Sequence, residues 1–148
     1  MKREPEFTWT EDGNAICVLV DEKDRIHVGT AMCHPNDVDM MSEKTGCEIA
    51  YRRARIEALK AVREDTKTAL AALKQLYYSM NHSKKFDPNS YENKTLQRHI
   101  RMTEFDLATI KDILATERKN LREYLQDKDL FYKRIRANRN KANSVKEN

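Results

Sequence analysis

Five residues whose side chains can bind metals or transfer protons lie in the eleven-residue segment CHPNDVDMMSE (33–43). They are Cys33, His34, Asp37, Asp39 and Glu43. Carboxylates are the ligands that hard cations such as Mg²⁺ prefer, and acidic clusters next to a histidine can perform acid–base catalysis. The segment is therefore either a metal or catalytic site, or the connection between a strand and a helix.

Each of these residues is also typical of a connection. Pro35 cannot donate to a sheet and ends a strand, and Asp37 and Asp39 favour turns through hydrogen bonds to the backbone. Glu43 is expected at the positive end of a helix dipole, which contributes about 0.3–1 kcal/mol. The spacing does not match an EF-hand loop. We predict a connection with no catalytic residue, no metal and no cofactor, and a site at His34, Asp37, Asp39 and Glu43 is the alternative.

The other candidate ligands are scattered. Cys17, Cys33 and Cys47 are odd in number and lack a CxxC spacing, which argues against a disulfide framework and against zinc. No Gly-rich phosphate loop, nucleophile elbow or HExxH motif occurs, so the sequence predicts a protein that is not an enzyme. No apolar run could span a membrane and MKREPEFTW lacks an apolar signal core, so a cytoplasmic location is expected.

Composition predicts long, solvent-exposed helices. The 148 residues are 39% hydrophobic and 35% charged, with a mean hydropathy of −0.87. The net charge of +4 combines −6 over residues 1–43 with +10 over 44–148. A basic helical region attached to an acidic N-terminal part makes nucleic acid a candidate partner.

The first part of the chain predicts a three-stranded antiparallel meander. EFTWT (6–10), AICVLV (15–20) and RIHVGTAM (25–32) are rich in β-branched or aromatic residues, and Asp12-Gly13 favours a tight turn. In the third strand Ile26, Val28, Thr30 and Met32 share one face. Because that face is the more apolar, we expect a helix to cover it.

The rest of the chain predicts two long helices, over about 45–80 and 90–139. Ser42 or Thr45 can cap the first, and Asn89 or Ser90 the second, after the break at NHSKKFDPNS (81–90). Apolar residues recur at helical spacing, with Arg53, Lys60, Lys67 and Lys74 beside the first stripe. The first stripe comprises Ile49, Ile56, Leu59, Val62, Thr66, Ala69, Leu70, Leu73, Leu76, Tyr77 and Met80. The second comprises Leu96, Ile100, Thr103, Leu107, Ile110, Leu114, Glu117, Leu121, Tyr124, Lys128, Phe131 and Ile135.

These elements predict an α+β protein, mostly α. It has a β-meander head (1–44), a coiled-coil-like antiparallel helical hairpin (45–140) and a flexible basic tail (141–148). Residues 126–140 extend beyond the start of the first helix and either brace the head or project into solvent. Because two helices alone leave much of their apolar surface in water, we expect self-association, most simply as a dimer.

Two surfaces could bind partners. At the hairpin tip, aromatic and basic residues could form a protein-binding surface or could pack under the loop; they are Tyr77, Tyr78, Lys84, Lys85, Phe86 and Tyr91. Basic residues on the helices could contact phosphates or could form solvated faces; they are Arg52, Arg53, Arg55, Lys60, Lys133, Arg134, Arg136 and Arg139.

Residues 15–60 resemble a known type of head. A meander that ends in GTAMCHPNDVD and leads into the helix SEKTGCEIAYRRARIEALK is similar to small phage- and prophage-encoded accessory proteins. It also resembles the β-meander-helix heads related to the double-stranded-RNA-binding domain. The resemblance implies a viral accessory protein without catalytic residues that binds host factors in the host cytoplasm.

Two functions are therefore expected. The first is a non-enzymatic protein that docks on, and inhibits by steric blocking, a host factor such as a defence enzyme through its helical arm. The second is a nucleic-acid-binding accessory protein that uses its basic helix faces. Neither function requires a membrane.

Overall fold

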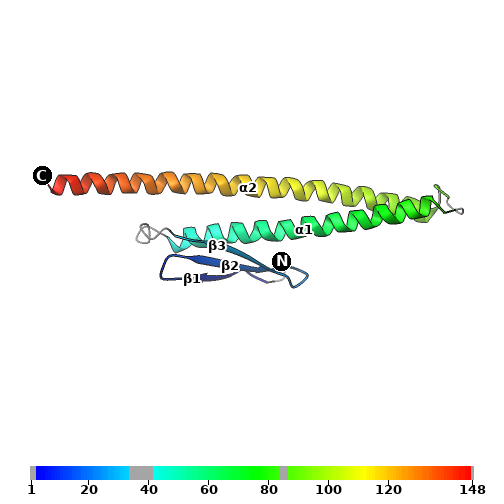
Figure 1. Ribbon diagram of the computed structural model, residues 1–148, viewed down its shortest axis with the longest axis horizontal. Helices are drawn as coiled ribbons and strands as arrows, with labels where there is room; N and C mark the ends of the chain where they lie inside the picture. Colours follow the sequence, from blue (N-terminus) through cyan, green and yellow to red (C-terminus); the bar gives the residue numbers. More distant parts are fainter. Residues whose placement is uncertain (1–2, 34–41, 84–86, 148) are drawn as a thin grey trace. The chain divides into compact units, whose positions relative to one another are not determined.

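The computed structural model describes residues 3–33, 42–83 and 87–147. Three strands, β1 (Glu6–Trp9), β2 (Ala15–Val20) and β3 (Ile26–Ala31), precede two helices, α1 (Glu43–Asn81) and α2 (Tyr91–Lys146) (Figure 1). The protein is thus α+β and mostly α, as the sequence predicts.

The strands form one antiparallel meander in the order β1-β2-β3. The β1–β2 turn contains Gly13 at a φ of 80°, the left-handed conformation expected of the Asp12-Gly13 pair. The register places Phe7, Cys17 and Gly29 across one face, and Glu6, Val18 and Val28 across the other. Each strand therefore contributes alternate residues to two different surfaces.

Helix α1 covers the face opposite to the one predicted. His27 and Ala31 of β3 are buried, whereas Ile26 is 67% and Val28 47% exposed. The reason lies at Gly29, where an added Cβ would collide with the backbone of α1 at Ala50 and Ala54. Because a strand residue without a side chain allows close helix packing, backbone proximity and not the more apolar face decides where α1 lies.

The core under α1 is made of small residues. Gly46, Ala50 and Ala54 recur every four residues and form the helix surface that meets the sheet. The buried cluster contains Ala15, Cys17, Leu19, Ala31, Ile49, Ala50 and Ala54, with Trp9, Tyr51, Tyr124 and Leu125 packed against it. Leu19 is the largest fully buried side chain of this cluster.

Serine residues cap both helices. The Ser42 Oγ accepts a hydrogen bond from the Thr45 amide at 3.4 Å, and the Ser90 Oγ accepts one from the Asn93 amide at 3.2 Å. Helix α2 continues to Lys146, whereas the sequence predicts an end near residue 139. Residues 141–146 are thus helical where a flexible tail is expected, because they contain neither Gly nor Pro.

The chain divides into two units, and the division falls within both helices. The head unit contains Met1–Glu57 and Thr116–Asn148, and the hairpin unit contains Ala58–Ala115. In the head unit, Tyr124 and Leu125 of α2 pack against the core, so this part of α2 braces the head. In the hairpin unit α1 and α2 are antiparallel, since Lys74 pairs with Glu104 at 3.1 Å and Tyr77 with Gln97 at 3.2 Å.

The predicted stripes are confirmed for α2 and need correction for α1. Every predicted α2 position is buried or half-buried except Phe131, which is exposed while Tyr132 is half-buried. On α1, Val62, Ala69 and Leu76 are exposed, although the sequence predicts them in the stripe. A straight pair of helices contacts along a narrow seam, so a wide apolar stripe leaves one margin uncovered.

Candidate interaction surface

The segment that suggests metal chemistry is only partly described. Glu43 begins α1 directly after the Ser42 cap, which agrees with the predicted connection. His34, Asp37 and Asp39 lie outside the described residues. Within residues 3–33, 42–83 and 87–147, no group of three or more His, Cys, Asp or Glu side chains is placed to share a metal ion.

Two cysteines of the head, Cys17 and Cys47, have raised pKa values. Burial, and then the neighbouring Cys47, raises the pKa of the Cys17 thiol. Burial, and then the charge of Glu43, raises the pKa of the Cys47 thiol. Since the thiolate is the nucleophilic form of cysteine, both groups are poorly suited to nucleophilic catalysis at neutral pH.

The arginines at the start of α1 are engaged within the head unit. Arg52 pairs with Glu48 at 2.7 Å and stacks over the Tyr124 ring at 5.0 Å. Arg53 donates to the Thr30 carbonyl oxygen at 2.6 Å, and Arg55 lies 3.5 Å from Glu117. These guanidinium groups support the packing of the head, and phosphate binding would compete with those contacts.

The basic residues near the end of α2 are exposed. Lys133 pairs with Asp129 at 2.9 Å, and Arg136 and Arg139 also have partners within the chain. Lys60, the other predicted basic residue, lies on α1 and has a partner as well. Between residues 131 and 146 there are six Lys or Arg and no Asp or Glu. This segment, which also includes Arg134, is the described region best suited to nucleic acid.

The hairpin tip combines packed and exposed aromatic residues. The Tyr77 hydroxyl accepts a hydrogen bond from Gln97 and lies beside a shallow depression of about 310 Å³. Tyr78, which stacks on His82, and Tyr91 are exposed. Tyr77 therefore holds the helices together while Tyr78 and Tyr91 face solvent; Lys84, Lys85 and Phe86 lie outside the described residues.

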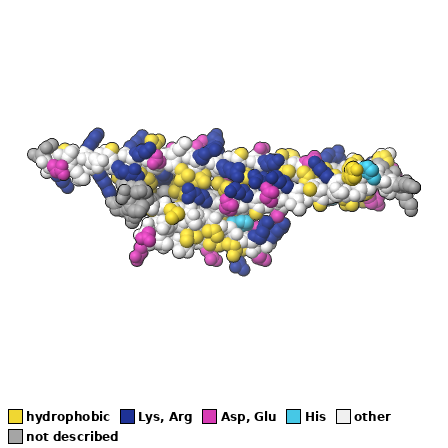
Figure 2. Space-filling view, viewed as in Figure 1, with side chains coloured by type: hydrophobic (Ala, Val, Ile, Leu, Met, Phe, Trp, Pro, Cys, Tyr) yellow, Lys and Arg dark blue, Asp and Glu magenta, His cyan; other side chains and the backbone are white. Residues whose placement is uncertain are grey.

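The outer face of the sheet, which the sequence predicts to be covered by a helix, is not covered by α1. It comprises the eight side chains on the face away from α1, Glu6, Thr8, Ile16, Val18, Val20, Ile26, Val28 and Thr30. Seven of them are β-branched, and Glu6 at one edge is the only charged one. In Figure 2 hydrophobic side chains gather over the strands of the head.

One signal in the sequence points to this face. The strand AICVLV is apolar at every position, and such strands are usually covered on both sides. Helix α1 covers only the side of Ala15, Cys17 and Leu19. Ile16, Val18 and Val20 remain partly exposed, next to the more exposed Ile26 and Val28. An apolar patch of this kind is typical of protein-binding sites.

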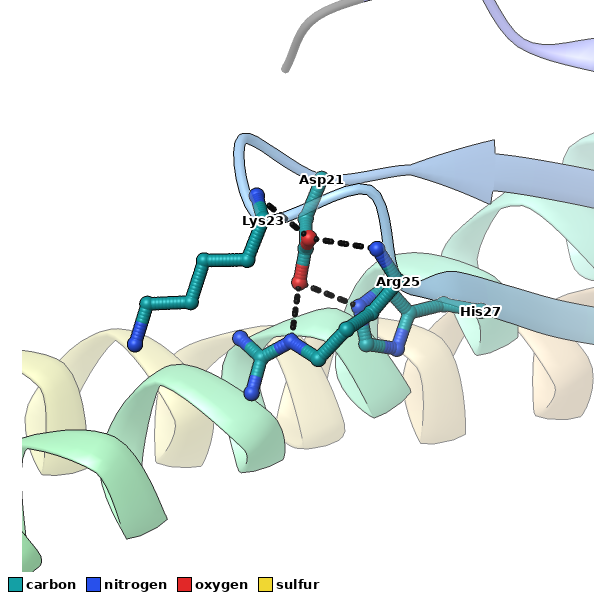
Figure 3. A network of polar contacts seen from close by, with 4 residues as sticks. All are labelled: Asp21, Lys23, Arg25 and His27. Atoms are coloured by element: carbon teal, nitrogen blue, oxygen red, sulfur yellow. Dashed lines mark hydrogen bonds and ion pairs between the residues drawn. The ribbon is translucent and has the colours of Figure 1, made fainter.

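A buried carboxylate fixes the turn that carries Val20 and Ile26. Asp21 accepts hydrogen bonds from the amides of Lys23 and Arg25 at 2.9 and 3.0 Å. Its other oxygen lies 2.8 Å from both the Arg25 Nε and the His27 Nε2 (Figure 3). These contacts, led by the one to His27, hold the pKa of Asp21 well below its usual range.

The network should make stability depend on pH below neutrality. Because the pKa of Asp21 is lower in the folded than in the unfolded chain, its stabilising contribution is complete above about pH 5 and is lost towards about pH 2. We expect Asp21→Asn to lower stability at pH 7 and to flatten this dependence, measured by urea unfolding at several pH values. Glu22→Gln, an exposed change in the same turn, should keep the wild-type dependence; equal slopes for wild type and Asp21→Asn would contradict the assignment.

No helix in the described part of the chain has an apolar segment long enough to cross a membrane. No protein-family model, curated protein or solved structure matches the chain. The resemblance of residues 15–60 to phage accessory proteins therefore stays a prediction.

Proposed function

We propose that this is a non-enzymatic interaction protein that binds another protein through the outer face of its sheet. The observation that carries the proposal is the exposed, almost uncharged surface around Ile26 and Val28. A partner that covers it removes apolar area from water, which contributes roughly 25 cal/mol per Å². The surface requires no catalytic group.

The geometry disfavours pairing of an added strand along the β3 edge of the sheet. Thr30 lies on the outer edge of the sheet, and its carbonyl oxygen already accepts a hydrogen bond from Arg53. An added strand would have to displace this arginine. The Asp21 network also fixes the turn between β2 and β3, so Val20 and Ile26 can bind with little loss of conformational freedom.

The partner class follows from the sequence resemblance. Phage accessory proteins of the predicted type act on host factors, and a defence enzyme is one such target. A rigid apolar surface attached to long helices can inhibit an enzyme by occupying its surface, without chemistry of its own. The contact surface proposed here is the sheet, whereas the sequence alone predicts docking through the helical arm.

A photo-crosslinking amino acid at Ile26 tests the proposal. In cells that contain the target, we expect a covalent adduct with one other protein, and Val28→Glu should reduce it at least about tenfold because a carboxylate is then buried without a partner. The same crosslinker at Leu130 and the matched change Val145→Glu, both at exposed positions, are the controls. An adduct that survives Val28→Glu would contradict the proposal.

Nucleic-acid binding is the second candidate, favoured by the six basic residues between 131 and 146. Nucleic-acid binding predicts a different result from the crosslinking experiment in the same cells. The captured material would be sensitive to nuclease and would dissociate steeply as salt rises, while Val28→Glu would have no effect.

A further inference from the structure

The hairpin unit buries few of its own side chains. Among its described residues only Asn93, Leu96 and Leu114 are buried, and the other residues along the seam between α1 and α2 are half-buried. Two helices of this length rarely form a stable core alone. The unit therefore has apolar surface that it does not bury itself. The contacts between α1 and α2 show on which side of the hairpin this surface lies.

One flank of the seam is polar. Lys74 pairs with Glu104, and Lys60 and Lys67 precede Lys74 at steps of seven residues. Residues seven apart lie on the same side of a helix in such a pair. The Tyr77–Gln97 hydrogen bond lies near the same flank, because Gln97 is seven residues before Glu104.

The opposite flank is apolar. Val62, Ala69 and Leu76 each follow a lysine of the polar flank by two residues, or about 200° around the helix, so they lie on the other side of the seam. All three are exposed. On α2, Lys111 lies on the polar flank, seven residues after Glu104, and Ile113 follows it by two residues, so Ile113 lies on the apolar flank. Ile113 and the nearby Met102 are both exposed. Three titratable residues lie on or beside this flank, His99 and Asp106 on α2 and the half-buried Asp65 on α1, which has a partner within the chain.

The apolar flank has the size that a dimer needs. The α1 segment 58–81 is about 36 Å long at 1.5 Å per residue, and two helices about 10 Å apart present a face roughly 20 Å wide. A second hairpin unit would cover about 700 Å² of this face, close to the typical area of about 800 Å² per partner.

The flank also matches itself. Val62 and Leu76 lie seven residues on either side of Ala69. An antiparallel second copy centred on Ala69 would bring Leu76 against Val62 of that copy and would place two small alanines at the axis. Such two-fold, self-complementary contacts are the usual form of a homodimer interface.

We infer that Val62, Ala69 and Leu76 form a homodimer interface, in which the hairpin units of two chains make a four-helix bundle. The dimer surface and the outer face of the sheet belong to different units, so this inference does not rest on the proposed function. Val28→Glu should leave the dimer intact, and loss of the dimer should leave the outer face of the sheet unchanged.

Mass measurement by light scattering or sedimentation equilibrium tests the inference. We expect twice the 17.4 kDa of one chain at micromolar concentrations. Leu76→Glu should weaken the dimer at least about 100-fold, because each interface then contains two buried carboxylates. Leu130→Glu is the matched control, since Leu130 is 54% exposed and Leu76 51%, and it should remain a dimer.

A monomeric wild type, or a Leu76→Glu protein that stays dimeric, would overturn the inference. A second variant covers the case in which Leu76→Glu lowers helix content. In a chain with Cys33→Ser and Cys47→Ala, Ala69→Cys should give a covalent dimer with a short bismaleimide, whereas the exposed Ala71→Cys should not. Equal crosslinking at both positions would exclude the proposed interface.

Discussion

Gly29→Ala should destabilise the head by about 3 kcal/mol or more. The added methyl group would fall well inside van der Waals contact with the Ala50 carbonyl oxygen and the Ala54 amide nitrogen. Both atoms belong to the backbone of α1, so no rotamer change can relieve the overlap and the helix must move off the sheet. Alanine also stabilises by restricting the unfolded chain, but by no more than about 1 kcal/mol. Urea unfolding followed by the fluorescence of Trp9, the only tryptophan, measures the change.

Gly46→Ala is the matched control for this effect. Its added methyl group would lie 2.6 Å from the Trp9 ring, which is a side chain and can shift. Alanine is also favoured over glycine within a helix by up to about 1 kcal/mol. We expect a clearly smaller loss of stability than for Gly29→Ala. If the two variants unfold at the same urea concentration, close contact between β3 and the backbone of α1 is not what positions the helix.

Leu19→Ala should cost about 3–4 kcal/mol, the usual range for a leucine removed from a tightly packed core. Leu19 is fully buried and, with Ile49, is one of two large side chains in a buried core otherwise made of alanine and cysteine. Small neighbours on rigid elements cannot collapse far into the vacated space, so most of the cavity should remain. A fall of roughly 10 °C in melting temperature is expected for a chain of this size.

Leu130→Ala is the same chemical change at an exposed position of α2. It removes little buried area and should alter stability by less than about 0.5 kcal/mol. Comparable losses for Leu19→Ala and Leu130→Ala would mean that the core described around Leu19 does not hold the head together.

Local sequence signals predicted the secondary structure well. The strands lie where β-branched residues gather between turn residues, and Ser42 and Ser90 cap the helices from two of the four positions considered. These features depend on interactions over a few residues, which a sequence displays directly. The end of α2 was the main error, since a polar, basic composition suggested a flexible tail for residues that form a regular helix.

Functional surfaces were less predictable than elements. The sequence predicts that Arg52, Arg53 and Arg55 either contact phosphates or form a solvated face, and each of them has a partner within the head unit. Their partners include Thr30 and Glu117, which are distant in the sequence, so no local pattern indicates them. For the hairpin tip the sequence leaves two alternatives, a binding surface or packing under the loop. Tyr78 and Tyr91 are exposed, as a binding surface requires, whereas Tyr77 is hydrogen-bonded to Gln97 across the two helices.

The strands and helices, the candidate caps, the seven-residue repeat of α2 and the antiparallel order of the meander follow from the amino-acid sequence alone, because hydrophobic periodicity and turn residues act locally. Which face of the sheet α1 covers depends instead on contacts between segments that are distant in the sequence. Apolarity favoured the face of Ile26 and Val28, but the missing side chain of Gly29 allowed the helix to approach the opposite face. Shape complementarity between distant segments outweighed the local difference in hydrophobicity, and it left the most apolar surface of the head exposed.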